Sequence, residues 1–272
     1  MEKDDSRRVR AKTTGRPTGN RDLNALVAEA VLKAGSRRVA DLAQELEVSE
    51  VSIRKSLVGL ENKGLIRRFH GEARAYDGDA IPFRMGLHYQ EKQYIAELAA
   101  SLIKDGETIF IEAGSAAAFL AERLKDMRDL SVATCNLFIA RIFRGSKVRV
   151  LVTGGSYQEE SESLVGPLAI ASVKELGFSK AFLGTSGYTQ DLGFTLNDFQ
   201  RAELSRTILA RGADNYILTD SSKFGRAHAA SFCSDPSLLQ AVITDKGISN
   251  SGYQQPLRGW YPRLRPLAFQ AS

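Results

Sequence analysis

Residues 39–73 combine three patterns that few folds accommodate in this order: two short amphipathic stretches, a tight turn between them, and a basic hairpin that contains a glycine. Apolar side chains recur every three or four positions through both stretches, which predicts two helices that share one buried stripe. The residues of this stripe are Leu42, Leu46, Val48, Ile53, Leu57 and Leu60. Ser49 stands where an N-cap belongs, so we expect the second helix to begin there.

Helix, turn, helix and basic hairpin in succession are typical of a winged helix-turn-helix, which presents its second helix to the major groove of DNA. Most polar residues of that helix fall off the apolar stripe, and we expect Ser56 to lie among them. A solvated polar face is the alternative, since charged helix faces often meet only water. We expect DNA contacts from Ser49, Ser52, Arg54, Lys55, Arg68 and His70.

The distribution of charge favours the DNA-binding interpretation. Residues 1–75 hold 16 Lys and Arg against 11 Asp and Glu, whereas residues 76–272 hold 21 of each, so the net charge of +5 lies entirely in the first part. A basic N-terminal part joined to a neutral remainder favours phosphate binding by the N-terminal part. Double-stranded operator DNA is therefore the expected partner.

Composition divides the chain into five segments. We expect a disordered basic arm at 1–21, a winged helix-turn-helix domain at 22–75, a linker at 76–90, an α/β domain at 91–249 and a C-terminal tail at 250–272. The arm is too polar to bury a core and is either a solvated tail or a minor-groove contact. The tail is expected to form a surface or an oligomer contact.

Short apolar strands alternate with amphipathic helices from residue 91 onward, which predicts a mainly parallel α/β sheet covered on both faces. We expect strands at 108–111, 130–134, 148–152, 181–183, 216–218 and 241–243, with helices at 91–104, 116–125, 137–143, 164–176 and 199–211. Open sheets of this kind bind ligands at the carboxyl ends of their strands.

Small and polar residues gather at those strand ends. The first strand leads through a glycine into a helix N-terminus, where free N–H groups attract an anion. Glycines permit close backbone approach and a lysine adds positive charge, so we expect a site for an anionic polyol, although such residues are also common in ordinary turns. The expected ligand-binding residues are Gly114, Ser115, Ala116, Thr134, Asn136, Gly154, Gly155 and Lys223.

Both halves resemble the DeoR family of transcriptional regulators. The run from Ser49 to Leu57, followed by Gly64, Arg68, His70, Gly71 and Ala73, is similar to the family's helix-turn-helix signature, with Lys55 and Ser56 in place of its usual arginine and acid. Further matches occur at 112–115, 154–155, 182–184, 193–195, 220–225 and 243–245.

This resemblance implies a C-terminal domain that is similar in fold to ribose-5-phosphate isomerase and that senses phosphorylated sugars. It implies a repressor of a carbohydrate-utilisation operon whose operator affinity is changed by the effector. A regulator without a ligand response is the first alternative. Paired half-sites would require at least a dimer, and closed symmetry favours a dimer or a tetramer.

An enzyme on the same sheet is a distant alternative. Enediol chemistry needs a positioned carboxylate base, but the strand at 181–183 leads into Gly184, Thr185 and Ser186, which offer none. Fold similarity alone does not import an activity. We expect no catalytic residue and no cofactor.

Cysteine content and hydropathy narrow the class of protein further. Cys135 and Cys233 are far apart and have no neighbouring histidine, so we expect neither a metal site nor a disulfide framework. Neither a signal-peptide segment nor an apolar run long enough to span a membrane occurs in the sequence. We therefore expect a soluble, cytoplasmic protein.

Overall fold

The computed structural model describes residues 20–62, 66–75, 81–250 and 252–253. The chain divides into two compact units, one ending at Arg74 and the other beginning at Ala75. Residues 1–19 of the expected basic arm and most of the expected tail lie outside the described residues, as does Gly64. Within the described part of the chain, none of the helices is long and apolar enough to cross a membrane.

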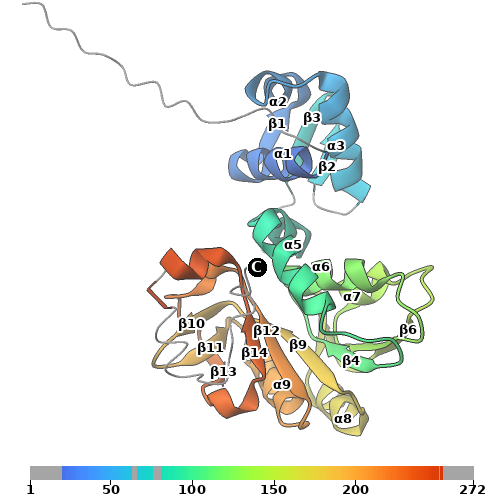
Figure 1. Ribbon diagram of the computed structural model, residues 1–272, viewed down its shortest axis with the longest axis vertical. Helices are drawn as coiled ribbons and strands as arrows, with labels where there is room; N and C mark the ends of the chain where they lie inside the picture. Colours follow the sequence, from blue (N-terminus) through green and yellow to red (C-terminus); the bar gives the residue numbers. More distant parts are fainter. Residues whose placement is uncertain (1–19, 63–65, 76–80, 251, 254–272) are drawn as a thin grey trace, which may run out of the picture. The chain divides into compact units, whose positions relative to one another are not determined.

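The first unit is a winged helix-turn-helix, as predicted. Its elements are α1 (Asn20–Ala34), β1 (Ser36–Arg38), α2 (Val39–Glu45), α3 (Glu50–Asn62), β2 (Ile66–Phe69) and β3 (Glu72–Ala75). The strands form a sheet in the order β1-β3-β2, in which β1 pairs antiparallel with β3. The three helices bury Val27, Val31, Leu42, Ile53, Leu57 and Leu60 between them. Figure 1 shows this unit with its elements labelled.

Two features of this unit differ from the sequence-based expectation. Ser56 does not belong to the polar face of α3: its side chain is buried, and its hydroxyl donates a hydrogen bond of 2.6 Å to Asn24 Oδ1 on α1. The hydrogen bond lets a polar side chain occupy a position between two packed helices. The short strand β1 was also not expected, because three residues carry too little pattern to predict a strand.

We predict that Ser56→Ala lowers the stability of the first unit by about 1 kcal/mol, since Asn24 loses its partner. Hydrogen exchange of the α3 amides measures this loss without interference from the other unit. Asn24→Ala serves as the second arm of a double-mutant cycle. If the two effects simply add in the double variant, the hydrogen bond contributes nothing.

The second unit is built on a six-stranded parallel sheet in the order β14-β12-β9-β4-β5-β6. The strands are β4 (Thr108–Ile111), β5 (Ser131–Thr134), β6 (Arg149–Val152), β9 (Lys180–Gly184), β12 (Asp214–Leu218) and β14 (Ala241–Ile243). Helices α5 (Tyr89–Ala100), α6 (Ser115–Leu124) and α7 (Leu137–Ile142) cover one face. Helices α8 (Pro167–Glu175) and α9 (Phe199–Leu209) cover the other (Figure 1). The predicted fold class is thus confirmed.

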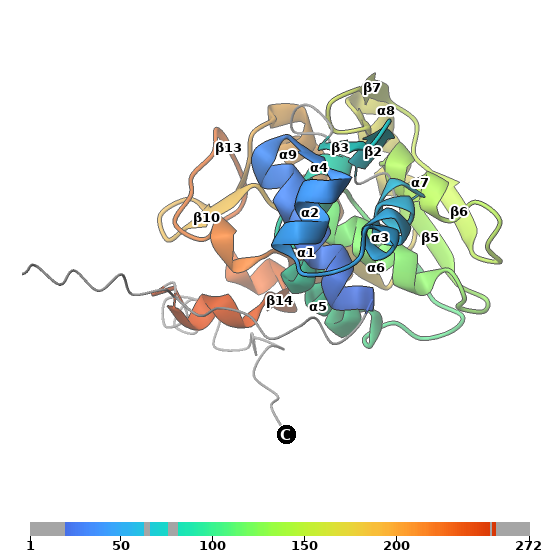
Figure 2. The same ribbon diagram turned by 90° about the horizontal axis from the view of Figure 1, so that it is seen from above.

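Two small antiparallel sheets were not predicted. One is the hairpin β7 (Ser156–Gln158) and β8 (Ser163–Val165). The other joins β10 (Gly187–Thr189), β11 (Gly193–Leu196) and β13 (Ala230–Cys233), and lies at the β14 side of the large sheet, away from β6 (Figures 1 and 2). Strands of three or four residues are too short to show a convincing alternation. The helix expected to begin at residue 164 begins instead at Pro167, since Leu164 pairs within β8.

The segment expected to be a linker also contains structure. Residues Ile81–Gly86 form the helix α4. Ile81 and Met85, one turn apart, are buried, and α4 packs against α5 and α6. This short helix was not predicted, because Gly78 and Pro82 are residue types that usually interrupt helices. A proline is, however, well tolerated in the first turn of a helix.

Candidate functional site

The first candidate site is the exposed face of α3. Ser49 caps this helix: its hydroxyl accepts a hydrogen bond of 3.2 Å from the Ser52 backbone N–H, and the two hydroxyls lie 2.9 Å apart. Arg54 is exposed and donates to Glu50 Oε2 at 2.8 Å, one turn earlier. Lys55 is exposed as well. These four predicted DNA-contacting residues therefore share the N-terminal half of one helix.

The remaining two predicted DNA-contacting residues belong to the hairpin. Arg68 lies on β2, where its backbone N–H donates to Glu61 Oε1 at 2.8 Å and its guanidinium pairs with the same carboxylate. The hydrogen bonds from Arg68, the backbone one first, lower the pKa of Glu61. His70 is exposed in the turn that follows, beside Gly71, which adopts a φ of +73°. Glu61 thereby ties the end of α3 to the hairpin.

The second candidate site lies where the direction of the strand order reverses. From β4 the chain proceeds outward through β5 and β6, then returns to the opposite side of β4 and continues through β9, β12 and β14. Ligands of open parallel sheets bind at the carboxyl ends of the strands beside such a switch point. A cavity of about 250 Å³ occupies this place, between the ends of β4, β9 and β12.

Two glycines shape the backbone at these strand ends. Gly114 has a φ of +111°, which L side chains rarely adopt, and it precedes Ser115 at the N-terminus of α6. A Cβ on Gly184 would lie 2.6 Å from the carbonyl oxygen of Ala113. Gly114, Ser115 and Ala116, three of the predicted ligand-binding residues, line the cavity at the first turn of α6.

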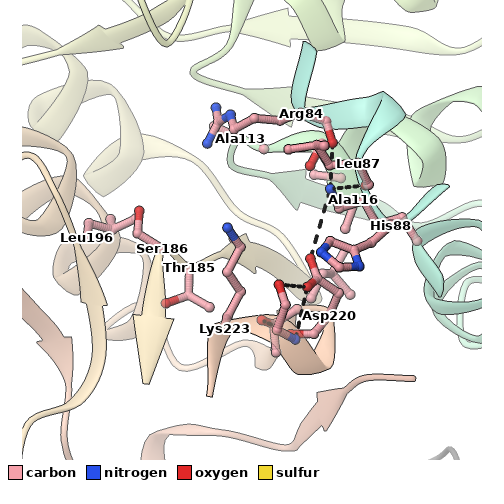
Figure 3. A pocket seen from close by; sticks show the side chains of 18 of the residues that line it. Arg84, Leu87, His88, Ala113, Ala116, Thr185, Ser186, Leu196, Asp220 and Lys223 are labelled. Carbon is pink, nitrogen blue, oxygen red and sulfur yellow. Dashed lines mark hydrogen bonds and ion pairs between the residues drawn. The ribbon is translucent and has the colours of Figure 1, made fainter. Parts of the chain in front are cut away.

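The cavity is strongly basic. Five cationic side chains from the described residues line it, and they come from four separate segments: Arg84, Lys92, Arg201, Lys223 and Arg226. Asp220 is the carboxylate among the described lining residues. Figure 3 shows the ammonium of Lys223 and the guanidinium of Arg84 pointing into the open space, with the hydroxyl of Ser186 at its edge. An anion with hydroxyl groups suits such a lining.

A buried ion pair supports one wall. Glu112 and Arg201 are almost fully buried, with Arg201 Nη2 3.4 Å from Glu112 Oε1. The other oxygen of Glu112 accepts a hydrogen bond of 3.2 Å from the Gly184 backbone N–H. The Nε of Arg201 is buried and has no hydrogen-bond partner in the described structure. Glu112 thus links β4, β9 and α9.

Lys92 supports the opposite wall. Its ammonium donates to the carbonyl oxygens of Arg84 at 2.5 Å and Leu87 at 2.7 Å, and lies 3.9 Å from Asp220 Oδ2. Burial lowers the pKa of Lys92 to about 8, although the negative charge of Asp220 acts to raise it. Burial works to raise the pKa of Asp220, but the charge of Lys92 and the hydrogen bonds from Ser222 outweigh it, so this pKa is lowered.

We predict that Lys92 makes folding stability rise with pH between about 8 and 10.5. The folded protein releases the Lys92 proton near pH 8 and the unfolded chain near pH 10.5, so the unfolded state binds more protons in this window. Denaturant unfolding of the wild type and of Lys92→Met over this range measures the effect. The stability difference, wild type minus variant, should increase with pH; a constant or falling difference would contradict the assignment.

Four predicted ligand-binding residues do not line this cavity: Thr134, Asn136, Gly154 and Gly155. Thr134 and Asn136 are fully buried. Asn136 caps α7 through Ile139 N and donates to Ser161 O at 2.7 Å. Gly155 lies against the backbone of Val165, where a Cβ would be 2.7 Å from the carbonyl oxygen. The ends of β5 and β6 are thus occupied by the β7–β8 hairpin.

Sequence reasoning missed most of the cationic lining. Arg84 lies in the helix that was expected to be linker, and Arg201 and Arg226 follow no strand end directly. Gly184 was noted as part of a match to the DeoR family, and both Gly184 and Thr185 because they offer no base, but neither was expected to bind the ligand. Their position directly after a buried strand was the available signal, since the strand-end rule applies to them as well as to Gly114.

Comparison with known proteins agrees with this architecture. The family model described as the DeoR C terminal sensor domain matches residues 87–246, and the one described as the DeoR-like helix-turn-helix domain matches residues 24–78. The chain belongs to the DeoR family. In this DeoR-family protein the first match lies within the unit that carries the basic cavity. The second contains α2, α3 and the hairpin of the winged helix-turn-helix unit, which we call the reader.

Curated relatives include the lactose phosphotransferase system repressor of Staphylococcus epidermidis, 31% identical over 230 residues, which cover 80% of this chain and 89% of the relative. The repressor of the same name from Streptococcus mutans is 31% identical over 227 residues, with the same coverage. Among solved structures, the ribose 5-phosphate isomerase A of Methanocaldococcus jannaschii is similar over 50% of this chain and 55% of its own, with 14% identity and a TM-score of 0.38.

Proposed function

We propose that this DeoR-family protein is a transcriptional repressor of a carbohydrate-utilisation operon and that a phosphorylated sugar changes its affinity for operator DNA. The observation that carries this proposal is the convergence of five cationic side chains and the N-terminus of α6 on one cavity. A phosphate dianion satisfies both features, because helix N-termini and cations attract anions. The relatives named as lactose phosphotransferase system repressors support the same interpretation.

Within the cavity we assign the phosphate to the Gly114–Ala116 turn, Lys223 and Arg84. The hydroxyls of Ser115 and Ser186 are available to a polyol, whereas that of Thr185 donates to the carbonyl oxygens of Gly187 and Thr195. Arg201 also lines the cavity, and its buried Nε has no hydrogen-bond partner in the described structure. The sequence had led us to expect ligand contacts at the ends of β5 and β6. The assignment proposed here uses residues at the end of β9 instead.

The carboxylates near the cavity favour a sensor over an isomerase. Glu112 is engaged by Gly184 N and Arg201, and Asp220 is engaged by Ser222 and Lys92. A general base needs a carboxylate that is available to the substrate. We therefore propose ligand binding without catalysis, in a cytoplasmic homo-oligomer, dimer or tetramer, whose paired readers contact two half-sites.

We predict that Lys223→Ala weakens phosphosugar binding about 10- to 100-fold, because a charge-assisted hydrogen bond is lost. Calorimetry with a panel of phosphorylated sugars measures the affinity. Lys174→Ala, which removes an exposed lysine on α8, and Gly154→Ala, which lies outside the cavity, should bind as the wild type does. Normal binding by Lys223→Ala would refute this site.

The ligand should also alter DNA affinity, and by linkage operator DNA should alter ligand affinity by the same factor. Couplings of this kind are typically about 1 to 3 kcal/mol. If the wild type binds DNA but no phosphosugar across a broad panel, the chain is a regulator without a ligand response. A thermal-shift screen reveals a bound ligand directly, since a ligand at about 100 times its Kd stabilises by about 2.7 kcal/mol.

We predict that Arg54→Ala, Lys55→Ala and Arg68→Ala weaken operator binding and leave the second unit folded. If Arg54 contacts a base edge, its loss reduces discrimination at that base pair by about 1 to 3 kcal/mol. Gel shifts at several salt concentrations separate base contacts from phosphate contacts. Arg123→Ala removes a guanidinium from the other unit and serves as the control; unchanged binding by Arg54→Ala and Lys55→Ala would contradict the role of α3.

A further inference from the structure

The face of α3 opposite its buried stripe carries an unusual set of side chains. With 3.6 residues per turn, Val51, Lys55 and Val58 follow one another along this face, while Ile53, Leu57 and Leu60 lie on the opposite, buried one. Val51 is 75% exposed and Val58 is 38% exposed. Two isopropyl groups and an ammonium therefore point away from the core of the unit.

The polar residues that flank this face are engaged within the protein. Ser49 bonds with Ser52, Arg54 pairs with Glu50, and Arg68 pairs with Glu61. Lys55, in contrast, has neither a hydrogen bond nor an ion pair to any described residue. What the centre of the face offers a partner is thus apolar contact from Val51 and Val58 and positive charge from Lys55.

Gly59 lies on the flank of this face, within the helix. A Cβ placed there would meet nothing within 4 Å, and its φ lies outside the range that favours glycine. Neither packing nor backbone conformation within this unit therefore calls for a glycine, although glycine weakens a helix interior relative to alanine. A glycine at such a position leaves room for another surface to approach the helix backbone closely.

We propose that α3 reads an A·T base pair through contact between the Val51 side chain and the C5-methyl of thymine, and that Gly59 lets the DNA sugar-phosphate backbone approach the helix. Thymine is the base that presents a methyl group in the major groove. Val51 is the second residue of α3, and recognition helices contact base edges with their N-terminal residues. This proposal rests on the DNA binding proposed above.

Charge favours DNA over an apolar protein surface as the occupant. Lys55 lies between the two valines, and the adjacent hairpin exposes Arg67, Arg68 and His70. Desolvating these cations against an apolar partner would be unfavourable, whereas phosphates on either side of a groove neutralise them. The face of α3 therefore offers apolar contact at its centre and positive charge around it. This arrangement matches a DNA major groove, which presents thymine methyl groups between two rows of phosphates.

The test uses the full-length protein and a duplex that the wild type enriches from a random double-stranded library. Each thymine of this duplex is then replaced by deoxyuridine, which lacks only the methyl group. The wild type should bind about three- to fourfold more weakly at one position, the weight of one buried methyl. Val51→Ala should lose this sensitivity and keep its response elsewhere. Equal discrimination by both proteins, or none by the wild type, would overturn the role of Val51.

Gly59→Ala tests the close approach. This variant should slow hydrogen exchange in α3, because alanine favours the helix, and yet bind the selected duplex at least tenfold more weakly. Gly177→Ala, at another glycine with open space around it, should bind as the wild type does. Wild-type affinity in Gly59→Ala would overturn its role. A library from which the wild type enriches no sequence would contradict DNA binding itself, which distinguishes that failure from the failure of this inference.

Discussion

The close backbone approach of Gly184 to the carbonyl oxygen of Ala113 is the constraint on which the candidate ligand-binding region depends. A side chain on Gly184 would collide with the Ala113 carbonyl. The ends of β4 and β9 can therefore lie this close together only because residue 184 is a glycine. Glu112 then spans the junction by accepting from the Gly184 N–H and pairing with Arg201. Because burial makes an unpaired charge very unfavourable, the ion pair holds α9 against the two strands. The position of the cavity follows from this junction.

The general architecture could be predicted from the sequence because its signals are local. The apolar stripe of α2 and α3 and the alternation of short apolar strands with amphipathic helices each lie within a few residues. All six strands of the large sheet were expected near their observed positions. Ser56 shows the limit of such patterns: whether a serine faces water or Asn24 depends on a helix that lies 32 residues earlier in the chain.

The candidate site could be predicted only in part, because strand order is not a local property. Every strand end carries small and polar residues, but the sheet order brings those of β4, β9 and β12 together and leaves those of β5 and β6 apart. The hairpin β7–β8 uses Asn136 for its own hydrogen bonds, which no spacing reveals. Arg84 and Arg201 reach the cavity from helices distant in the sequence, and tertiary packing alone assigns them there.

The strand order also has a consequence for the newly made protein. The reader is complete once Ala75 has been synthesised, but β4 can acquire its neighbour β9 only after Gly184, and the cavity lining ends at Arg226. At about 5 to 20 residues per second, the ribosome needs roughly 8 to 30 s to pass from the first point to the last. During this interval a nascent chain carries a finished reader and an unfinished sensor. Premature termination between these points would therefore release a reader that no effector could control.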